Sequence, residues 1–304
     1  MDNLAILLCA YNGGKFLREQ LDSFVAQSFK NWRLFVYDDQ STDDTKDLVE
    51  SHDAADKITF ISNDTKLGFA KNFLNGLHST PAHFDFYAIS DQDDIWLENK
   101  LQRAVAYLKT IDDQKPALYC SRTTLVDSIG TLIGYSPLFQ KKPSFRNALV
   151  QSIAGGNTMV LNKAACDLVA RVERDTEVVS HDWFIYQLVT GAGGVIYYDP
   201  HSEILYRQHE ANLIGSNNGF CAKLSRIKML LNNSFKAWND TNTRALQNSR
   251  DLLTQENRDV LDIFVRSRES YLIPRLMGFL KSGIYRQTFL GNVALVAGAM
   301  LNKI

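Results

Sequence analysis

The sequence predicts an α/β protein: a mostly parallel central sheet with helices on both faces, followed by a helical carboxy-terminal region. Two observations predict this fold. In the amino-terminal part, short apolar runs alternate with segments whose apolar residues recur at helical spacing, which implies parallel strands joined by right-handed crossovers. From about residue 220, strand-like runs disappear and Leu, Asn, Lys and Arg dominate. We therefore expect a sheet-containing domain over residues 1–215 and a helical region over 216–304.

The expected elements follow one another in a regular order. The first four strands are predicted at 4–10, 32–37, 58–63 and 84–89, with helices at 15–28, at 45–51 and after Gly68. Later elements are predicted as strands at 117–121, 158–161, 195–198 and 204–207, a hairpin within 124–133 and a helix at 182–189. Ligands of open α/β sheets bind at the carboxyl ends of the strands, so the residues that follow each strand are the first candidates for a site.

Bulk properties indicate an ordinary intracellular enzyme. The 304 residues are 45% hydrophobic, enough for a sizeable core, and the formal net charge of −1 carries no signature of nucleic-acid binding. The four cysteines are far apart and form no metal-binding pattern, which favours reduced thiols of a cytosolic protein. The residues after Met1 lack the basic start and long apolar core of an export signal. We expect a cytoplasmic protein that does not bind nucleic acid.

The most informative segment is the acidic run Ser90–Asp94, which directly follows a buried strand. Asp91, Asp93 and Asp94 repel one another and are costly to desolvate unless a cation lies among them. Oxygen ligands suit a hard divalent ion that carries a substrate diphosphate. The segment therefore predicts a metal and nucleotide site, although an acidic loop that caps the following helix is the structural alternative.

Two other strand ends support this interpretation. Residues 10–14 turn from the first strand into the first helix, and residues 38–45 follow the second strand with several acids and hydroxyls. Neither segment contains a Walker phosphate loop or a complete dinucleotide fingerprint, so neither an NTPase nor a dehydrogenase is indicated. Together with the acidic run they offer contacts to a base, a ribose and a metal along one edge of the sheet.

Four motifs together resemble the inverting, nucleotide-sugar-dependent glycosyltransferases of family 2, which have the GT-A fold. The motifs are Ala10-Tyr11-Asn12-Gly13, Tyr37 to Thr45, Leu67 to Asn72 and Ser90 to Trp96, and the similarity covers roughly Leu4 to Asn212. The Ser-Asp-Gln-Asp-Asp-Ile-Trp form, together with Tyr206-Arg207-Gln208-His209 and Asn212, resembles bacterial rhamnosyltransferases of cell-surface polysaccharide synthesis.

The resemblance implies a role for each matching residue. The residues implied in nucleotide-sugar binding are Ala10, Tyr11, Asn12, Asp38, Asp39, Lys71, Asp91 and Gln92. The implied ligands of a divalent metal, Mg²⁺ or Mn²⁺, are Asp93, Asp91 and His209. Acceptor-side positions are Gly156, Asn157, His181, Trp183 and Arg207. Two positions depart from the family: Ala10 stands where Thr is frequent, and Lys71 replaces an Arg, so a point charge replaces a planar donor fork.

The implied catalytic base is Asp182, at the start of a predicted aromatic helix. An inverting transfer needs one group to take the proton of the acceptor hydroxyl, and one carboxylate suffices. The alternative is that Asp182 only caps the helix. His181 stands where the family has a first acid, and its role stays open. Trp183 either stacks on a sugar or belongs to the core, and Arg207 either holds an anion or forms a salt bridge.

The function expected from these motifs is transfer of a sugar, L-rhamnose from dTDP-rhamnose, to a glycan or lipid-linked acceptor in surface polysaccharide synthesis. UDP-glucose, UDP-galactose or an N-acetylated UDP-sugar are the alternative donors. A nucleotidyltransferase is disfavoured because residues 10–14 lack a basic glycine-rich loop. A noncatalytic nucleotide-sugar or glycan-binding module is disfavoured because it would not need Asp182.

The carboxy-terminal stretch bears on location. The apolar piece Phe289–Leu301 is shorter than the ~20 residues that a spanning helix needs. With Lys281, Arg286 and Lys303 around it, the piece could lie in a membrane interface, which would place the protein at the inner face of the cell membrane. The alternative is packing on the main domain or on a second subunit, which leaves a homo-oligomer open.

Overall fold

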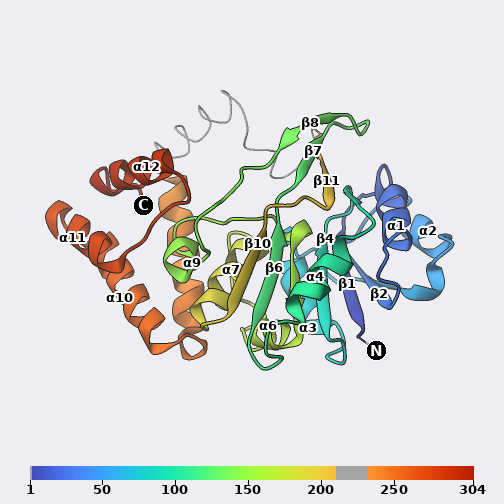
Figure 1. The fold of residues 1–304 in the computed structure, drawn as a ribbon, viewed down its shortest axis with the longest axis horizontal. Coiled ribbons are helices and arrows are strands. Elements are labelled where there is room, and N and C mark those ends of the chain that lie inside the picture. The colour runs from blue at the N-terminus through green and yellow to red at the C-terminus, as the bar shows by residue number, and fades with distance from the viewer. Residues whose placement is uncertain (1, 210–231) are drawn as a thin grey trace.

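The computed structural model describes residues 2–209 and 232–304 (Figure 1). The predicted domain boundary at 215/216, Asn212 and Cys221 therefore lie outside the described residues. Cys9, Cys120 and Cys166 are free thiols.

The order of strands and helices follows the prediction closely. The strands are β1 Leu4–Ala10, β2 Trp32–Asp38, β3 Ile58–Ser62, β4 Phe86–Ser90, β5 Ile95–Trp96, β6 Ala117–Ser121, β7 Thr124–Val126, β8 Leu132–Tyr135, β9 Val160–Asn162, β10 Val195–Asp199 and β11 Ile204–Arg207. The helices are α1 Leu17–Val25, α2 Thr45–Glu50, α3 Phe69–Ser79, α4 Lys100–Leu108, α5 Phe145–Ala148, α6 Lys163–Ala170, α7 His181–Gly191, α9 Ser234–Asn248, α10 Gln255–Glu269, α11 Leu272–Ser282 and α12 Phe289–Met300.

The main sheet has seven strands in the order β10-β6-β9-β4-β1-β2-β3. All neighbouring pairs are parallel except those of β9, which runs antiparallel to both β4 and β6. The strand expected at 158–161 starts later than predicted, because Gly156–Thr158 forms a short 3₁₀ turn. The prediction of a mostly parallel sheet is confirmed.

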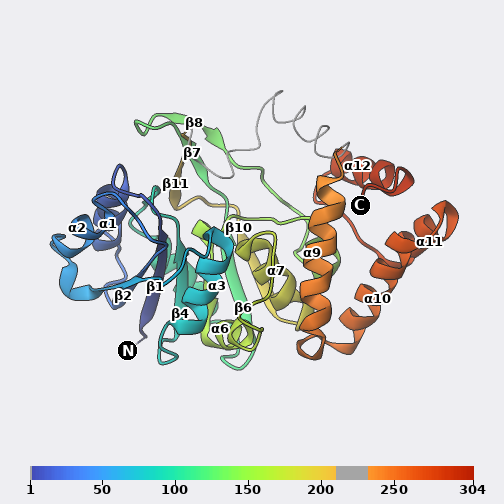
Figure 2. The same ribbon diagram turned by 180° about the vertical axis from the view of Figure 1, so that it is seen from behind.

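Strand β1 shows how the two faces of the sheet are covered. Leu4, Ile6 and Leu8 point into a core shared with α1 and α4, whereas Ala5 and Leu7 point into the opposite core shared with α3, α6 and α7. Alternate side chains of a strand face opposite sides of the sheet, so a strand with both faces covered has a continuous apolar sequence. Figure 2 shows α3, α6 and α7 on the second face.

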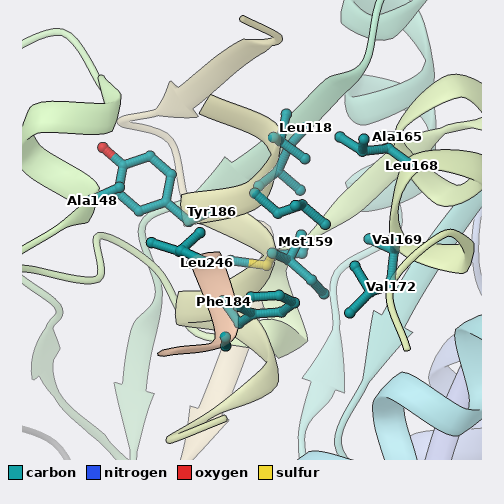
Figure 3. Packing of buried hydrophobic residues seen from close by; sticks show 14 of the residues in the cluster. Leu118, Ala148, Met159, Ala165, Leu168, Val169, Val172, Phe184, Tyr186 and Leu246 are labelled. Atoms are coloured by element: carbon teal, nitrogen blue, oxygen red, sulfur yellow. The ribbon is translucent and has the colours of Figure 1, made fainter. Parts of the chain in front are cut away.

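The carboxy-terminal helices pack onto this second core. Leu246 of α9 lies beside Met159 and Phe184 in the packed interior (Figure 3). Phe264 of α10 and Phe279 of α11 belong to the same apolar cluster, with their rings stacked at a centroid distance of 5.6 Å. The described part of the carboxy-terminal region is helical, as predicted, and its core is continuous with that of the sheet domain.

A smaller sheet stands at the carboxyl end of the main one (Figure 1). Its strand order is β5-β11-β7-β8, with β7 and β8 forming the predicted hairpin. Because β5 follows the acidic run directly, its pairing with β11 brings that run next to residues 207–209.

Within residues 2–209 and 232–304, no helix combines the length and the apolar character needed to cross a membrane.

We predict that Phe264→Ala destabilises the whole protein. The side chain is fully buried, and its removal leaves a cavity in the shared core, which costs about 3–5 kcal/mol. Equilibrium urea unfolding measures this cost, and Val25→Ala, at a half-exposed position of α1, is the control with an expected change near zero. A cost for Phe264→Ala no larger than that of the control would contradict the shared core.

Candidate active site

The ends of β1, β2 and β4 bring three predicted site segments together. Ala10 pairs with Asp38, and Leu8 pairs with Ser90, in parallel registers. The residues that follow these strands therefore emerge side by side at one edge of the sheet. This arrangement is the one expected from the sequence for the segments that begin at Tyr11 and Asp91.

The loops after β1 and β2 are joined by hydrogen bonds. The Asn12 backbone N–H donates to Ser41 Oγ at 2.9 Å, and Asn12 Oδ1 accepts from the Thr42 N–H at 2.8 Å. The Gly13 N–H donates to Thr45 Oγ1 at 2.9 Å. Asn12 has a left-handed backbone with φ of 49°, a conformation that asparagine adopts more readily than most residues. The hydroxyls after β2 thus hold the first loop in shape.

Gln92 connects the acidic run to the same loop. Its Oε1 accepts from the Tyr11 N–H at 2.9 Å, and its Nε2 donates to the Tyr11 carbonyl at 3.1 Å. In this structure Gln92 thus holds the Tyr11 backbone at two points, and its contact with a nucleotide stays a prediction. The Tyr11 ring itself is 43% exposed, with Lys66 Nζ 3.5 Å from its centroid. An aromatic face with a nearby cation suits a base that carries a phosphate chain.

Asp39 anchors the next loop. Its two carboxylate oxygens accept from the Leu67 N–H at 2.7 Å, the Gly68 N–H at 2.8 Å and Asn63 Nδ2 at 3.1 Å. These bonds fix the chain that enters α3, where Lys71 is exposed in the first turn.

The remaining residues of this group are buried beside Asp39. Ala10 accepts a hydrogen bond from the Asp39 N–H through its carbonyl at 2.8 Å, and Asp38 Oδ2 accepts from the Ser41 N–H at 3.0 Å. Both residues are less than 5% exposed, so in this structure they shape the loops from beneath.

Burial and acidic neighbours disfavour the ionised form of Asp91. Burial, followed by the charges of Asp93 and Asp182, raises the pKa of Asp91 to about 8. Asp182 comes from α7, far along the chain, and its charge also acts on Asp91. The packing agrees, because Asn157 bonds Asp94 while the adjacent Gly156 packs against His181, the neighbour of Asp182. The fold thus gathers the predicted base and the predicted metal ligands into one acidic cluster.

Asp93 and His209 form the outer part of this cluster. His209 Nε2 lies 2.8 Å from Asp93 Oδ2, and the imidazole packs against the Phe16 ring at a centroid distance of 4.8 Å. The two side chains are therefore adjacent, and their role as metal ligands stays a prediction.

Asp94 lies beneath the cluster and is fully buried. Its Oδ2 accepts from Asn157 Nδ2 at 2.6 Å, and its Oδ1 accepts from the Arg207 N–H at 3.2 Å. Burial, with the nearby charges of Asp91 and Asp93, raises the pKa of Asp94 well above its usual range. Asn157, predicted on the acceptor side, is thus an internal partner of the acidic run.

Arg207 is an anchor and lies below the surface of the site. It is 2% exposed, and Nε donates to the Asp93 carbonyl at 3.1 Å while Nη1 donates to the Ser128 carbonyl at 2.9 Å. Nη2 forms an ion pair with Glu19, and the guanidinium lies over the Phe16 ring. Of the two interpretations left open by the sequence, the salt bridge is the one that the structure contains.

The acidic cluster fits a divalent cation in its chemistry. Two carboxylates, Asp91 and Asp93, and the His209 imidazole offer suitable donors, and burial followed by the charges of Asp93 and Asp182 raises the pKa of Asp91. Among residues 2–209 and 232–304, no three such side chains are gathered closely enough to enclose an ion alone. Mg²⁺ sites for nucleotides commonly use one or two carboxylates and complete their coordination with substrate phosphates and water.

Asp182 occupies the first turn of α7 and is partly buried. The N-cap position of this helix is Ser180, so Asp182 is not the N-cap that the structural alternative required. One of its oxygens accepts the Trp183 N–H at 2.7 Å. Trp183 is buried, and its indole N–H donates to the Ala148 carbonyl at 2.6 Å, which places it in the core.

His181 is held in an apolar pocket. It is 3% exposed and stacks on Phe73 at a centroid distance of 4.0 Å, and both ring nitrogens lack a hydrogen-bond partner in the described structure. Burial lowers the pKa of His181 to about 4, although Asp182 acts in the opposite direction. A Cβ on Gly156 would lie 2.1 Å from His181 Nε2, so glycine is needed at this position.

Several residues of the site were missed by the sequence analysis. Phe16, Glu19 and Lys66 belong to segments that read as ordinary helix and loop. Lys100 is buried, with its Nζ 3.5 Å from the centroid of the Trp96 ring, and burial lowers its pKa to about 7. A lysine beside apolar helix residues is a weak signal for Lys100, and Phe16, Glu19 and Lys66 stand several residues away from the strand ends.

Residues 5–123 match the family described as Glycosyl transferase family 2. The dTDP-rhamnosyl transferase RfbG of Shigella flexneri is 28% identical over 244 residues, which cover 75% of this chain and 81% of the relative. The UDP-Glc:alpha-D-GlcNAc-diphosphoundecaprenol beta-1,3-glucosyltransferase WfgD of Escherichia coli is 29% identical over 34% of this chain and 40% of its own length.

Solved structures resemble the fold over nearly the whole chain. Residues 1–349 of S. aureus TarS, in complex with UDP, align with a TM-score of 0.56 and 14% identity, covering 92% of this chain and 90% of that fragment. The mannosyltransferase PcManGT of Pyrobaculum calidifontis, in complex with GDP-Man and Mn²⁺, aligns with a TM-score of 0.51 and 14% identity, covering 99% and 86%. These neighbours are GT-A proteins, and the predicted fold class is confirmed.

We predict that Gly156→Ala destabilises the protein through His181. The added methyl group would overlap the imidazole, and overpacking of this kind costs about 1–3 kcal/mol. Removing the ring by His181→Ala makes room for the methyl group, so the double variant should lose less stability than the two single losses predict. Urea unfolding of all four proteins measures this coupling. Strictly additive losses would show that the two side chains do not meet.

Proposed function

We propose that this chain, a family 2 glycosyltransferase with the GT-A fold, transfers a sugar from a nucleotide-sugar donor to an acceptor hydroxyl in a single, inverting displacement. The observation that carries the proposal is that the start of α7 lies beside the acidic run: Gly156 packs against His181, the adjacent Asn157 bonds Asp94, and the charge of Asp182 raises the pKa of Asp91. A base and a diphosphate-binding cluster are then adjacent, as a direct displacement requires. A module that only binds a glycan would have no use for an additional, repelling carboxylate at that place.

The nucleotide is proposed to lie over the loops after β1 and β2. The exposed Tyr11 ring, with Lys66 beside it, would hold the base, and Lys71 is directed to solvent near the loop that Asp39 fixes. Asn12 and Gln92 hold the Tyr11 loop from both sides. The structural neighbours with bound UDP and GDP-Man support a nucleotide donor.

Asp182 is proposed as the base. Its carboxylate would take the proton from the acceptor hydroxyl while that oxygen attacks the anomeric carbon on the face opposite the nucleoside diphosphate, and the bond to the diphosphate breaks in the same step. The acceptor would approach on the α7 side of the cluster. There Gly156 has no side chain, so His181 can pack against it, and this packing fixes the start of α7. His181 and Asn157 act there as positioning residues.

The proposed metal ligands are Asp93, Asp91 and His209. A bound Mg²⁺ or Mn²⁺ would neutralise the charge that develops on the departing diphosphate. Asp93 and His209 already lie within hydrogen-bonding distance of each other, and the packing of Phe16 against His209 limits the freedom of the imidazole. The Mn²⁺ complex of the mannosyltransferase neighbour supports a divalent ion in this fold.

The proposed donor is dTDP-rhamnose, supported by the similarity to the dTDP-rhamnosyl transferase of Shigella flexneri over most of both chains. A β-L donor would give an α-linked product by inversion. The proposed acceptor is a lipid-linked or growing glycan of a surface polysaccharide, on the cytoplasmic side of the membrane. A UDP-sugar is the second candidate donor, favoured by the shorter match to the UDP-glucose-dependent relative.

We predict that Asp182→Asn abolishes transfer without loss of the fold or of nucleotide binding. An amide cannot accept the proton, and the loss of a general base lowers kcat by about 10²–10⁴-fold. Release of nucleoside diphosphate measures turnover, and calorimetry measures nucleotide affinity. The matched control is Asp113→Asn, an exposed acid before β6 at the opposite edge of the sheet, which should retain activity. Near-normal turnover by Asp182→Asn would exclude it as the base.

We predict that dTDP-rhamnose with Mn²⁺ or Mg²⁺ raises the melting temperature more than UDP-glucose, UDP-galactose or UDP-N-acetylglucosamine. A ligand at about 100 times its Kd adds roughly 2.7 kcal/mol to apparent stability. Asp93→Ala should remove the metal-dependent part of the shift, and direct titration of Mn²⁺ by calorimetry reads metal binding without turnover. A larger shift with a UDP-sugar would show that this sugar nucleotide, and not dTDP-rhamnose, is the donor. An Mn²⁺ titration of Asp93→Ala that matches the wild type would refute the role of Asp93.

A further inference from the structure

Charge is distributed unevenly along the chain. Residues 128–166 and 270–304 contain eight of the 33 Lys and Arg residues and none of the 34 Asp and Glu residues. The rest of the chain therefore has 25 cations against 34 acids, although the whole protein is nearly neutral. Two long segments without a single acidic side chain point to a surface that meets negative charge.

The two acid-free segments meet in the folded chain. Asn147 Nδ2 donates to the Tyr285 carbonyl at 2.9 Å, and the Lys141 N–H donates to Gln287 Oε1 at 3.0 Å. Arg146 also donates to the Ser282 carbonyl. Contacts of this kind join the chain after β8 to the loop between α11 and α12, so the two segments form one continuous region.

Helices α11 and α12 present apolar faces to solvent within this region. On α12 the exposed residues Phe289, Val293, Val296 and Met300 recur at helical spacing, while Leu295 on the opposite face is buried. Both helices are too short to cross a membrane. Short helices with one apolar face are able to bind in a membrane interface with that face buried among the lipids.

The same pattern of exposed apolar residues recurs on α11 at Ile273, Met277 and Leu280. The exposed cations Lys142 and Lys281 belong to the two acid-free segments that form this region. Apolar residues with basic neighbours and no acids are typical of surfaces that bind anionic membranes.

The β7–β8 hairpin lies on the same side of the molecule as α12. Figures 1 and 2 both show the hairpin and α12 at the upper edge, where the strands of the main sheet end, whereas the start of β1 lies at the lower edge. Ile129 at the hairpin tip is 85% exposed, and Leu132 and Ile133 are also exposed. The apolar tip and α12 therefore stand on the side of the molecule to which the active site opens.

We propose that α11, α12 and the β7–β8 hairpin tip form a docking surface for a bilayer that contains anionic lipids. Charge complementarity selects this occupant over a second copy of the chain. Two copies packed through this surface would bring cations such as Lys142 and Lys281 toward each other. Glu256, an acid beside this region, already pairs with Arg146, whereas lipid phosphates supply further negative charge. The surface would hold the active site near acceptors that are anchored in the membrane.

The test uses flotation of the full chain with vesicles of phosphatidylcholine alone or mixed with phosphatidylglycerol, without any donor or acceptor. The wild type should float with the mixed vesicles, and salt should weaken this binding. The variant Ile273→Gln, Leu280→Gln, Phe289→Gln, Val296→Gln should bind at least about tenfold less, because each substitution removes an exposed apolar contact. Its far-ultraviolet circular dichroism and melting temperature should match those of the wild type.

The matched control is Val25→Gln, another exposed apolar residue on the surface of α1, which should bind vesicles like the wild type. The double variant Lys142→Glu, Lys281→Glu should lose the preference for anionic vesicles. Undiminished binding by the fourfold variant, or equal binding to neutral and anionic vesicles, would overturn the proposal. The proposal would also be overturned if the wild type did not bind vesicles but formed a dimer, and the fourfold variant did not form that dimer. Because no turnover is measured, these outcomes are independent of the proposed transfer reaction.

Discussion

The structure depends on the confinement of negative charge at the carboxyl edge of the main sheet. Asp91, Asp93 and Asp94 follow one strand, and Asp182 approaches them from α7, so their mutual repulsion has to be offset within the fold. The protein offsets it in two ways. Asp94 receives two internal hydrogen bonds, and burial raises the pKa values of both Asp94 and Asp91, which favours their neutral forms. The fold therefore offsets the repulsion partly by hydrogen bonding and partly by disfavouring ionisation.

Arg207 organises the supports of this cluster. One side chain reaches the carbonyl of Asp93, the hairpin at Ser128 and Glu19 of α1, and it lies over the Phe16 ring. Strand β11, which ends at this residue, lies between β5 and β7 in the small sheet. A lysine could not replace it, because a single ammonium group lacks the planar fork that serves three acceptors in different directions.

The sequence predicted the elements and the strand ends well, since apolar runs and the acids that follow them are local signals. It identified Asp182 only through a family-like motif, because no local pattern tells which distant helix will face a strand end. The contacts of Asn157 with Asp94 and of Gln92 with Tyr11 were beyond prediction for the same reason. Each joins segments about sixty to eighty residues apart, and the side chains involved are compatible with many other partners.

Lys100 shows how the charge is balanced below the site. Its Nζ is buried over the Trp96 ring without a hydrogen-bond partner in the described structure, and burial lowers its pKa to about 7, against the influence of Asp94. Burial acts on Asp94 in the opposite direction and favours its neutral form. Both shifts reduce the charge that the interior has to hold. The buried pair Lys100 and Asp94 can therefore approach neutrality by itself. The negative potential that remains belongs to the outer carboxylates, which would attract a cation that in turn binds a diphosphate.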